Sequence, residues 1–165
     1  FWCAREASYQ AADARTASAK TAFESGRGRC GEESIFGVNA LRSAGIPARQ
    51  VYAPRWSHCD DNHAWVEAYL DGNWYFLGAC EPELELNQGW FNGAASRAMM
   101  IHSRWFDSVL PQDEEVIGGE GMAAMLNQLS RYADTTKAEV TVKDASGMPA
   151  SGVQVDFHVL NYAEF

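Results

Sequence analysis

The stretch Gly28-Arg29-Cys30-Gly31-Glu32-Glu33-Ser34 decides the fold and carries the first chemical signal. A glycine-rich turn leads directly into a helical pattern, and Cys30 stands where the two meet. A thiol in the first turn of a helix lies at the positive end of the helix dipole, which favours the thiolate. Because the thiolate is the nucleophilic form of cysteine, the stretch predicts a reactive residue. A small buried thiol beside a helix cap is the alternative.

The helix that begins at Cys30 is predicted to extend to residue 44. Its apolar residues recur at helical spacing and form one broad face. They are Ile35, Val38 and Leu41, flanked by Phe36 and Ala40. Gly45 and Pro47 end the helix. Glu32 and Glu33 complement the dipole in the first turn, and because they would oppose a thiolate we expect both to point to solvent.

The flanking segments predict a short helix and a β-hairpin. Residues 18–25 form the helix, which Gly26 ends. Residues 49–53 indicate a strand, and residues 62–70 alternate in polarity as a half-buried strand does. One face of this second strand carries His63, Trp65, Glu67 and Tyr69. Asp71-Gly72 is typical of a two-residue hairpin turn, with a return strand over residues 74–77.

The remaining chain gives weaker local patterns. Residues near 94 indicate a helical turn, and residues 99–106 a strand or buried turn. Residues 112–120 are expected to form a loop, and residues 122–132 a helix with Met122, Met125, Leu126 and Leu129 on one face. Strands are expected at 138–142 and 153–160, joined by a turn-rich stretch that starts at Asp144. We therefore divide the chain into a first domain, residues 1–134, and the start of a truncated β-sandwich module, residues 135–165, of the kind appended to bacterial surface proteins.

Charge and composition narrow the possible partners. The net charge is −9 and no basic run is present, which argues against nucleic acid or an anionic membrane as partner. No apolar run approaches the roughly 20 residues that span a bilayer. The abrupt ends of the sequence indicate a segment of a longer protein. The four cysteines are too few for a disulfide scaffold, although Cys59 and Cys80 are a possible pair.

A cysteine nucleophile needs a base, and His63 is the candidate because it begins an alternating strand. The blocks Gly-Arg-Cys-Gly-Glu, Ala-Gly-Ile-Pro-Ala-Arg, Asn-His-Ala-Trp-Val-Glu and Asp-Gly-Asn-Trp occur in this order. In combination they resemble the core of the transglutaminase-like superfamily, which includes transglutaminases, bacterial thiol peptidases and peptide N-glycanases. The resemblance covers residues 9–90. It implies an α+β, papain-like fold in which a cysteine-bearing helix packs on an antiparallel sheet, with Cys30 as nucleophile and His63 as base.

The third catalytic position departs from the family pattern. The family has an aspartate after the strand that follows the histidine, and that position is Gly78 here. A two-residue hairpin pairs Leu70 with Asn73, so that Gly78 lies on the face of His63 and Glu81 on the other face. Glu81 is a candidate orienting acid only if the turn is longer or the strand bends. Loss of this acid in serine triads lowers the rate by up to ~10⁴.

The sequence therefore predicts a thiol enzyme that cleaves or transfers a peptide or amide bond through a Cys30 thioester, with hydrolysis favoured, no cofactor, and a protein or peptide substrate. A catalytically weak or inactive binding module of a bacterial envelope protein is the alternative, favoured by Gly78. A peptide N-glycanase is weaker, because the zinc-binding cysteine pairs of those enzymes are absent. The superfamily suggests an extracytoplasmic location.

Two further groups of side chains are candidate sites. Trp56 and Trp65 are candidate walls of a substrate cleft, although single tryptophans more often belong to a core. The segment from His58 to His63 collects metal-ligand residue types. It matches no standard structural zinc spacing, and no metal site is assigned. His102 and His158 have no catalytic neighbours in the sequence, and packing or surface exposure is expected for both.

Overall fold

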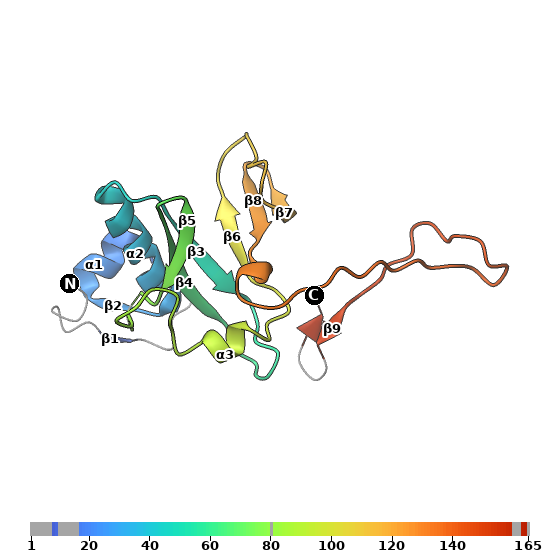
Figure 1. Ribbon diagram of the computed structural model, residues 1–165, viewed down its shortest axis with the longest axis horizontal. Coiled ribbons are helices and arrows are strands. Elements are labelled where there is room, and N and C mark those ends of the chain that lie inside the picture. Colours follow the sequence, from blue (N-terminus) through green and yellow to red (C-terminus); the bar gives the residue numbers. More distant parts are fainter. Residues whose placement is uncertain (1–7, 10–16, 80, 160–162, 165) are drawn as a thin grey trace.

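The computed structural model describes residues 8–9, 17–79, 81–159 and 163–164 (Figure 1). Its helices are α1 (Ala19–Ser25), α2 (Cys30–Ser43) and α3 (Asn92–Ala95), with a 3₁₀ turn η2 at Leu129–Arg131. The strands of the main sheet are β3 (Ala48–Ala53), β4 (His63–Leu70), β5 (Asn73–Leu77), β6 (His102–Trp105), β7 (Val116–Glu120) and β8 (Ala123–Asn127). Two short pairs lie outside it, β1 (Ser8–Tyr9) with β2 (Arg27–Gly28), and β9 (His158–Val159) with β10 (Ala163–Glu164).

The six-stranded sheet has the order β5-β4-β3-β6-β8-β7, and every neighbouring pair is antiparallel. Helix α2 packs on β3 and β4, and α1 packs on α2. Both helices therefore lie beside the same half of the sheet (Figure 1). The predicted α+β fold, with a cysteine-bearing helix on an antiparallel sheet, is confirmed.

The two predicted helices of the first half are found where their caps place them. The Ser18 side chain accepts a hydrogen bond from the Thr21 N–H and begins α1, and Gly26 ends it in the left-handed conformation. Helix α2 begins at Cys30 and ends one residue before Ala44. These boundaries follow from local capping chemistry, which is why the sequence predicts them well.

The hairpin between β4 and β5 has the predicted register. Leu70 pairs with Asn73, and the ladder extends to Val66 and Leu77. Asp71 and Gly72 both have positive φ, 48° and 84°, as a type I′ turn requires. This register fixes which residues of β4 face α2 and which face away from it.

The sheet carries a different core on each face. Under α2, Val38 packs with Ala48 and Val66. The opposite face holds the larger, aromatic core, which contains Val51, Trp56, Trp65, Phe91 and Ile101. Because His63 and Trp65 alternate with Ala64 and Val66 along β4, the imidazole belongs to the aromatic side of the strand.

The helix predicted over residues 122–132 is wrong. Residues 116–127 form the hairpin of β7 and β8, followed by the turn η2. Gly121 has a positive φ of 62° at the turn between these strands. Leu126 is buried on the sheet, whereas Met122 is 70% exposed. The helical spacing of these apolar residues was coincidental, because β8 is held by its pairing with β6.

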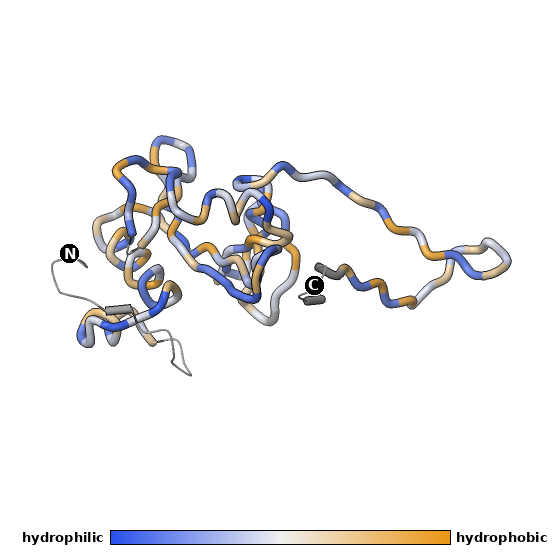
Figure 2. The backbone as a smooth tube through the Cα atoms, turned by 90° about the horizontal axis from the view of Figure 1, so that it is seen from below, coloured by the Kyte–Doolittle hydropathy of each residue, from blue (hydrophilic) through white to orange (hydrophobic). Residues whose placement is uncertain are grey.

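The C-terminal segment extends away from the sheet (Figure 1). Residues 138–142 form no strand, and β9 covers only two residues of the strand predicted over 153–160. The predicted turn at Asp144 is present, and a bridge joins Lys143 to Pro149. Hydrophobic and hydrophilic residues alternate along both arms (Figure 2), and their side chains are largely exposed. The assignment of these arms to a second domain remains a prediction.

Within the described residues, no helix has the length and apolar character needed to cross a bilayer.

Candidate active site

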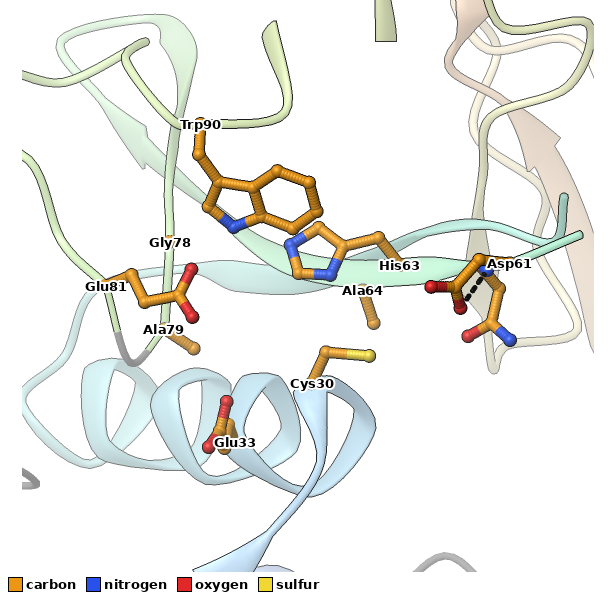
Figure 3. Close-up of a pocket in the computed structure, with 10 residues that line it drawn as sticks. Cys30, Glu33, Asp61, His63, Ala64, Gly78, Ala79, Glu81 and Trp90 are labelled. Atoms are coloured by element: carbon orange, nitrogen blue, oxygen red, sulfur yellow. Dashed lines mark hydrogen bonds between the residues drawn. The ribbon is translucent and has the colours of Figure 1, made fainter. Parts of the chain in front are cut away.

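Cys30 and His63 open onto one cavity of about 240 Å³. Cys30 is the first residue of α2, and His63 is the first residue of β4. The end of a helix and the end of a neighbouring strand thus bring them together across 33 residues of sequence. Figure 3 shows the imidazole over the first turn of α2, with one ring nitrogen on the side of Cys30 and the other toward Glu81 and Trp90.

The Cys30 thiol is protonated in the resting site. Burial raises the pKa of Cys30, and the negative charges of Glu33 and Glu32 act in the same direction. The backbone N–H groups of Ala64 and Gly31 lower it, because they interact with the sulfur and favour the thiolate. The first turn of the helix favours the thiolate, as the sequence suggested, but the cost of burying the charge is larger and keeps the proton on the sulfur.

Glu32 and Glu33 do not point to solvent, contrary to the expectation from the sequence. They are only 3% and 7% exposed. The Glu32 carboxylate accepts hydrogen bonds from the backbone N–H of Arg29 at 2.8 Å and of Ala17 at 3.1 Å. Burial alone would raise the pKa of Glu32, but these bonds lower it. Glu33 instead lines the cavity beside Cys30 (Figure 3).

His63 is neutral at rest. Burial lowers its pKa to about 4, and the nearby charge of Asp61 raises it only slightly in return. The ring is surrounded by aromatic side chains, with centroid distances of 4.7 Å to Trp90, 5.0 Å to Phe91 and 5.8 Å to Trp65. The resting pair is therefore a neutral thiol and a neutral imidazole, and it must transfer a proton before the sulfur can attack.

Residues 1–79 match the family model of the transglutaminase-like superfamily. This segment belongs to that superfamily. A solved structure of a candidate cysteine protease from Cytophaga hutchinsonii is similar over 77% of this chain, with 21% identity and a TM-score of 0.42. The match spans about half (49%) of that protein's chain. No curated protein sequence matches the chain. The superfamily and the Cys–His cavity together support a general thiol enzyme.

The residue at the predicted third catalytic position, Gly78, has no side chain. Strand β5 ends at Leu77, and the chain bends so that both Gly78 and Glu81 line the cavity. Glu81 reaches the cavity from beyond the end of β5, and its role as orienting acid stays a prediction. The Glu81 carboxylate makes no hydrogen bond to His63, however. No other side chain in the described part of the chain hydrogen-bonds to that imidazole either. The aromatic rings, rather than a carboxylate, hold this base.

The transglutaminase-like cavity has a tryptophan wall, but it is not the predicted one. Trp56 and Trp65 are 2% and 0% exposed and lie in the aromatic core, stacked at 6.4 Å. Neither lines the cavity. Trp90, which is 60% exposed, does. It lies in an irregular stretch before α3, where no periodic pattern marks it, and sequence reasoning missed it.

Arg49 and Glu67, which end two of the sequence blocks that resemble the superfamily, form a buried network behind the site. Arg49 on β3 is directly opposite Glu67 on β4, and its Nε donates to the carboxylate at 2.6 Å. A second glutamate, Glu114, accepts from Arg49 Nη1 at 2.7 Å. Tyr132 donates to Glu67 at 2.6 Å and accepts from Trp65 Nε1 at 2.8 Å. These blocks therefore hold β3, β4 and the segment after β8 together.

The segment from His58 to His63 is divided between two environments. Asp60 forms an ion pair with Arg55, and Asp61 lines the cavity. Cys59 is a free thiol that packs on the aromatic core, whereas Cys80 lies outside the described residues. Over the described part of the chain, no three His, Cys, Asp or Glu side chains are grouped to hold a metal.

Proposed function

We propose that the protein is a thiol acyl-transfer enzyme that hydrolyses a peptide or amide bond through a thioester on Cys30. The observation that carries this proposal is the shared cavity of Cys30 and His63, with the Ala64 and Gly31 N–H groups at the sulfur. Transfer to an amine is the related reaction of the same intermediate. We favour hydrolysis, because no sequence motif indicates a site for an amine acceptor.

The first half of the reaction forms the thioester. The imidazole of His63 takes the thiol proton, and the sulfur attacks the carbonyl carbon, whose π electrons move to oxygen. The backbone N–H of Cys30 has no partner within α2, because it belongs to the first turn, and in this proposal it donates to the oxyanion. The C–N bond then breaks, and the imidazolium returns its proton to the leaving amine.

The second half releases the acid. A water molecule gives a proton to His63 as its oxygen attacks the thioester carbon. The C–S bond breaks, the carboxylic acid leaves, and the proton returns to the Cys30 sulfur. Because His63 is neutral before each half, it can act as a base both times. No cofactor takes part in these steps, and the substrate class is a protein or peptide.

The experiment is acetyl transfer from p-nitrophenyl acetate, which needs no knowledge of the natural substrate. We expect a burst of p-nitrophenolate and an acetyl group on Cys30, located by peptide mass spectrometry. Cys30→Ser should abolish the burst, and His63→Ala should slow it by about 10²-fold or more. Cys59, a free thiol outside the cavity, is the internal reference. Acetylation of Cys30 no faster than of Cys59 would contradict the proposal.

A second candidate function is a binding module with a weakened site, located outside the cytoplasm of a bacterium. Gly78 favours this candidate, because a glycine stands where the superfamily usually has the orienting acid. Such a module would bind peptide in the cavity without turning it over. Full acetylation of Cys30 with no release over hours, and no dependence on His63, would favour this candidate over hydrolysis.

A further inference from the structure

A second cavity of about 240 Å³ lies on the other side of the first turn of α2. Cys30 lines the first cavity, and the next residue, Gly31, lines the second. The two strands beside α2 are shared between the cavities in the same way. Tyr52 of β3 lines the second cavity, and its direct partner on β4, Ala64, lines the first. The two cavities therefore flank the nucleophile.

The second cavity is close enough to Cys30 for their charges to interact. Burial raises the pKa of the Tyr52 phenol, and a negative charge on Cys30 raises it further. The ring of Tyr52 packs edge-on against His102, with centroids 5.6 Å apart. A group bound beside Tyr52 would thus lie near a carbonyl held at Cys30.

The second cavity presents hydrogen-bond donors and no carboxylate. Its described lining includes Arg104, Tyr52 and His102, but no Asp or Glu. Arg104 has no ion pair, and the Tyr52 hydroxyl no hydrogen bond, within the described part of the chain. His102 is 5% exposed, and its Nδ1 atom is buried without a hydrogen-bond partner. A cationic fork beside an unpaired hydroxyl group is the chemistry that binds a carboxylate.

The first cavity has the opposite character. Glu33, Asp61 and Glu81 line it, and none of its described lining residues is a lysine or an arginine. Negative charge on one side of Cys30 and positive charge on the other would orient a substrate that carries both charges. Such a polarity gives direction to binding rather than strength alone.

We propose that the second cavity is a subsite for a carboxylate of the substrate, next to the reacting thiol. This proposal rests on the proposed function. The substrate is then a short peptide that lies across the first turn of α2, with its scissile carbonyl at Cys30. Its carboxylate accepts hydrogen bonds from Arg104 and Tyr52, and its positively charged part lies in the first cavity.

The test compares alkylation of Cys30 by iodoacetate, which carries a carboxylate, with alkylation by neutral iodoacetamide. The ratio of the two rate constants reports the preference for a carboxylate beside the sulfur, whatever the reactivity of the thiol itself. We expect Arg104→Gln to lower this ratio about threefold, the effect typical of one solvent-exposed ion pair. Tyr52→Phe should lower it about twofold, through loss of one hydrogen bond.

Lys137→Gln is the matched control, because it removes the same charge from an exposed residue of the extended segment, and its ratio should equal that of the wild type. An unchanged ratio in Arg104→Gln overturns the subsite. A fall in Arg104→Gln with none in Tyr52→Phe also overturns it, since the guanidinium then acts at a distance without a site. Failure of the proposed function gives a different result, a slow Cys30 acetylation with the ratios still measurable.

Discussion

A Cβ atom on Gly78 would lie 2.9 Å from the backbone carbonyl oxygen of Glu81. The chain bend that brings Glu81 to the cavity therefore closes the third position to any side chain. Backbone contacts this short do not relax by moving a flexible side-chain end. The position that lacks an acid is in this way also a position where an acid does not fit.

We predict that Gly78→Asp does not raise the activity. It should lower the free energy of unfolding by about 1–3 kcal/mol, the usual cost of overpacking, and leave the acetylation rate of Cys30 no higher than in the wild type. Gly78→Ala is the control and should cost a similar amount. Urea unfolding and the p-nitrophenyl acetate burst measure the two effects. A stable Gly78→Asp variant that reacts tenfold faster would show that the Glu81 bend moves aside.

The buried ion pair of Arg49 and Glu67 leads to a second prediction. Arg49→Met removes the cation from two carboxylates, those of Glu67 and Glu114, and should destabilise the fold by about 3–5 kcal/mol. The control is Arg55→Met, which breaks the partly exposed pair with Asp60 and should cost less than about 1 kcal/mol. Equal losses in urea unfolding would contradict the structural role assigned to Arg49.

Local signals predicted the part of the fold that carries the Cys–His pair. Caps at Ser18 and Gly26, strict alternation after Asn62, and an Asp71-Gly72 turn each describe a few neighbouring residues. All of these local features are present in the structure, because tertiary packing in this region is compatible with them. The register of the hairpin followed as well, and with it the placement of Gly78 on the side of His63.

The sequence predicted less where distant contacts decide the structure. Residues 122–132 have a helical spacing of apolar residues, yet Gln128 and Tyr132 are required by Arg49 and Glu67, across the sheet. Such partners are dozens of positions away and leave no local pattern. The burial of Glu33 has a similar cause, because the first turn of α2 packs against β4, and the helical pattern by itself carries no sign of that contact.

His63 predicts how stability depends on pH. Its pKa falls from 6.5 in the unfolded chain to about 4 in the folded one, so the unfolded state binds more protons between these values. Stability is then full above pH 6.5 and decreases as the pH falls toward 4, by up to about 3 kcal/mol. His63→Gln should show a shallower decrease in urea unfolding between pH 7.5 and 4.5. Parallel profiles of the two proteins would contradict the buried neutral imidazole.

Glu33 should control the reactivity of Cys30. Its charge helps to raise the pKa of the Cys30 thiol, so Glu33→Gln should lower that pKa and speed iodoacetamide alkylation at pH 8 by about three- to tenfold. The control is Glu24→Gln, at an exposed residue of α1, and it should alkylate like the wild type. At a pH far above the pKa of the thiol the Glu33 variant should lose its advantage, because the thiolate is then complete in both proteins. An equal acceleration at every pH would instead mean that the cavity had opened.

Trp90 is predicted to position the base. Its ring lies 4.7 Å from that of His63, and no described carboxylate hydrogen-bonds to the imidazole in its place. Because Trp90 is 60% exposed, Trp90→Ala should change the free energy of unfolding by less than about 1 kcal/mol. It should nevertheless slow acetylation of Cys30 about tenfold, and Trp90→Phe should restore most of the rate by keeping an aromatic face on the imidazole. In a His63→Ala background Trp90→Ala should add little, since the group it orients is gone. Additive losses in the double variant would place Trp90 in substrate binding instead.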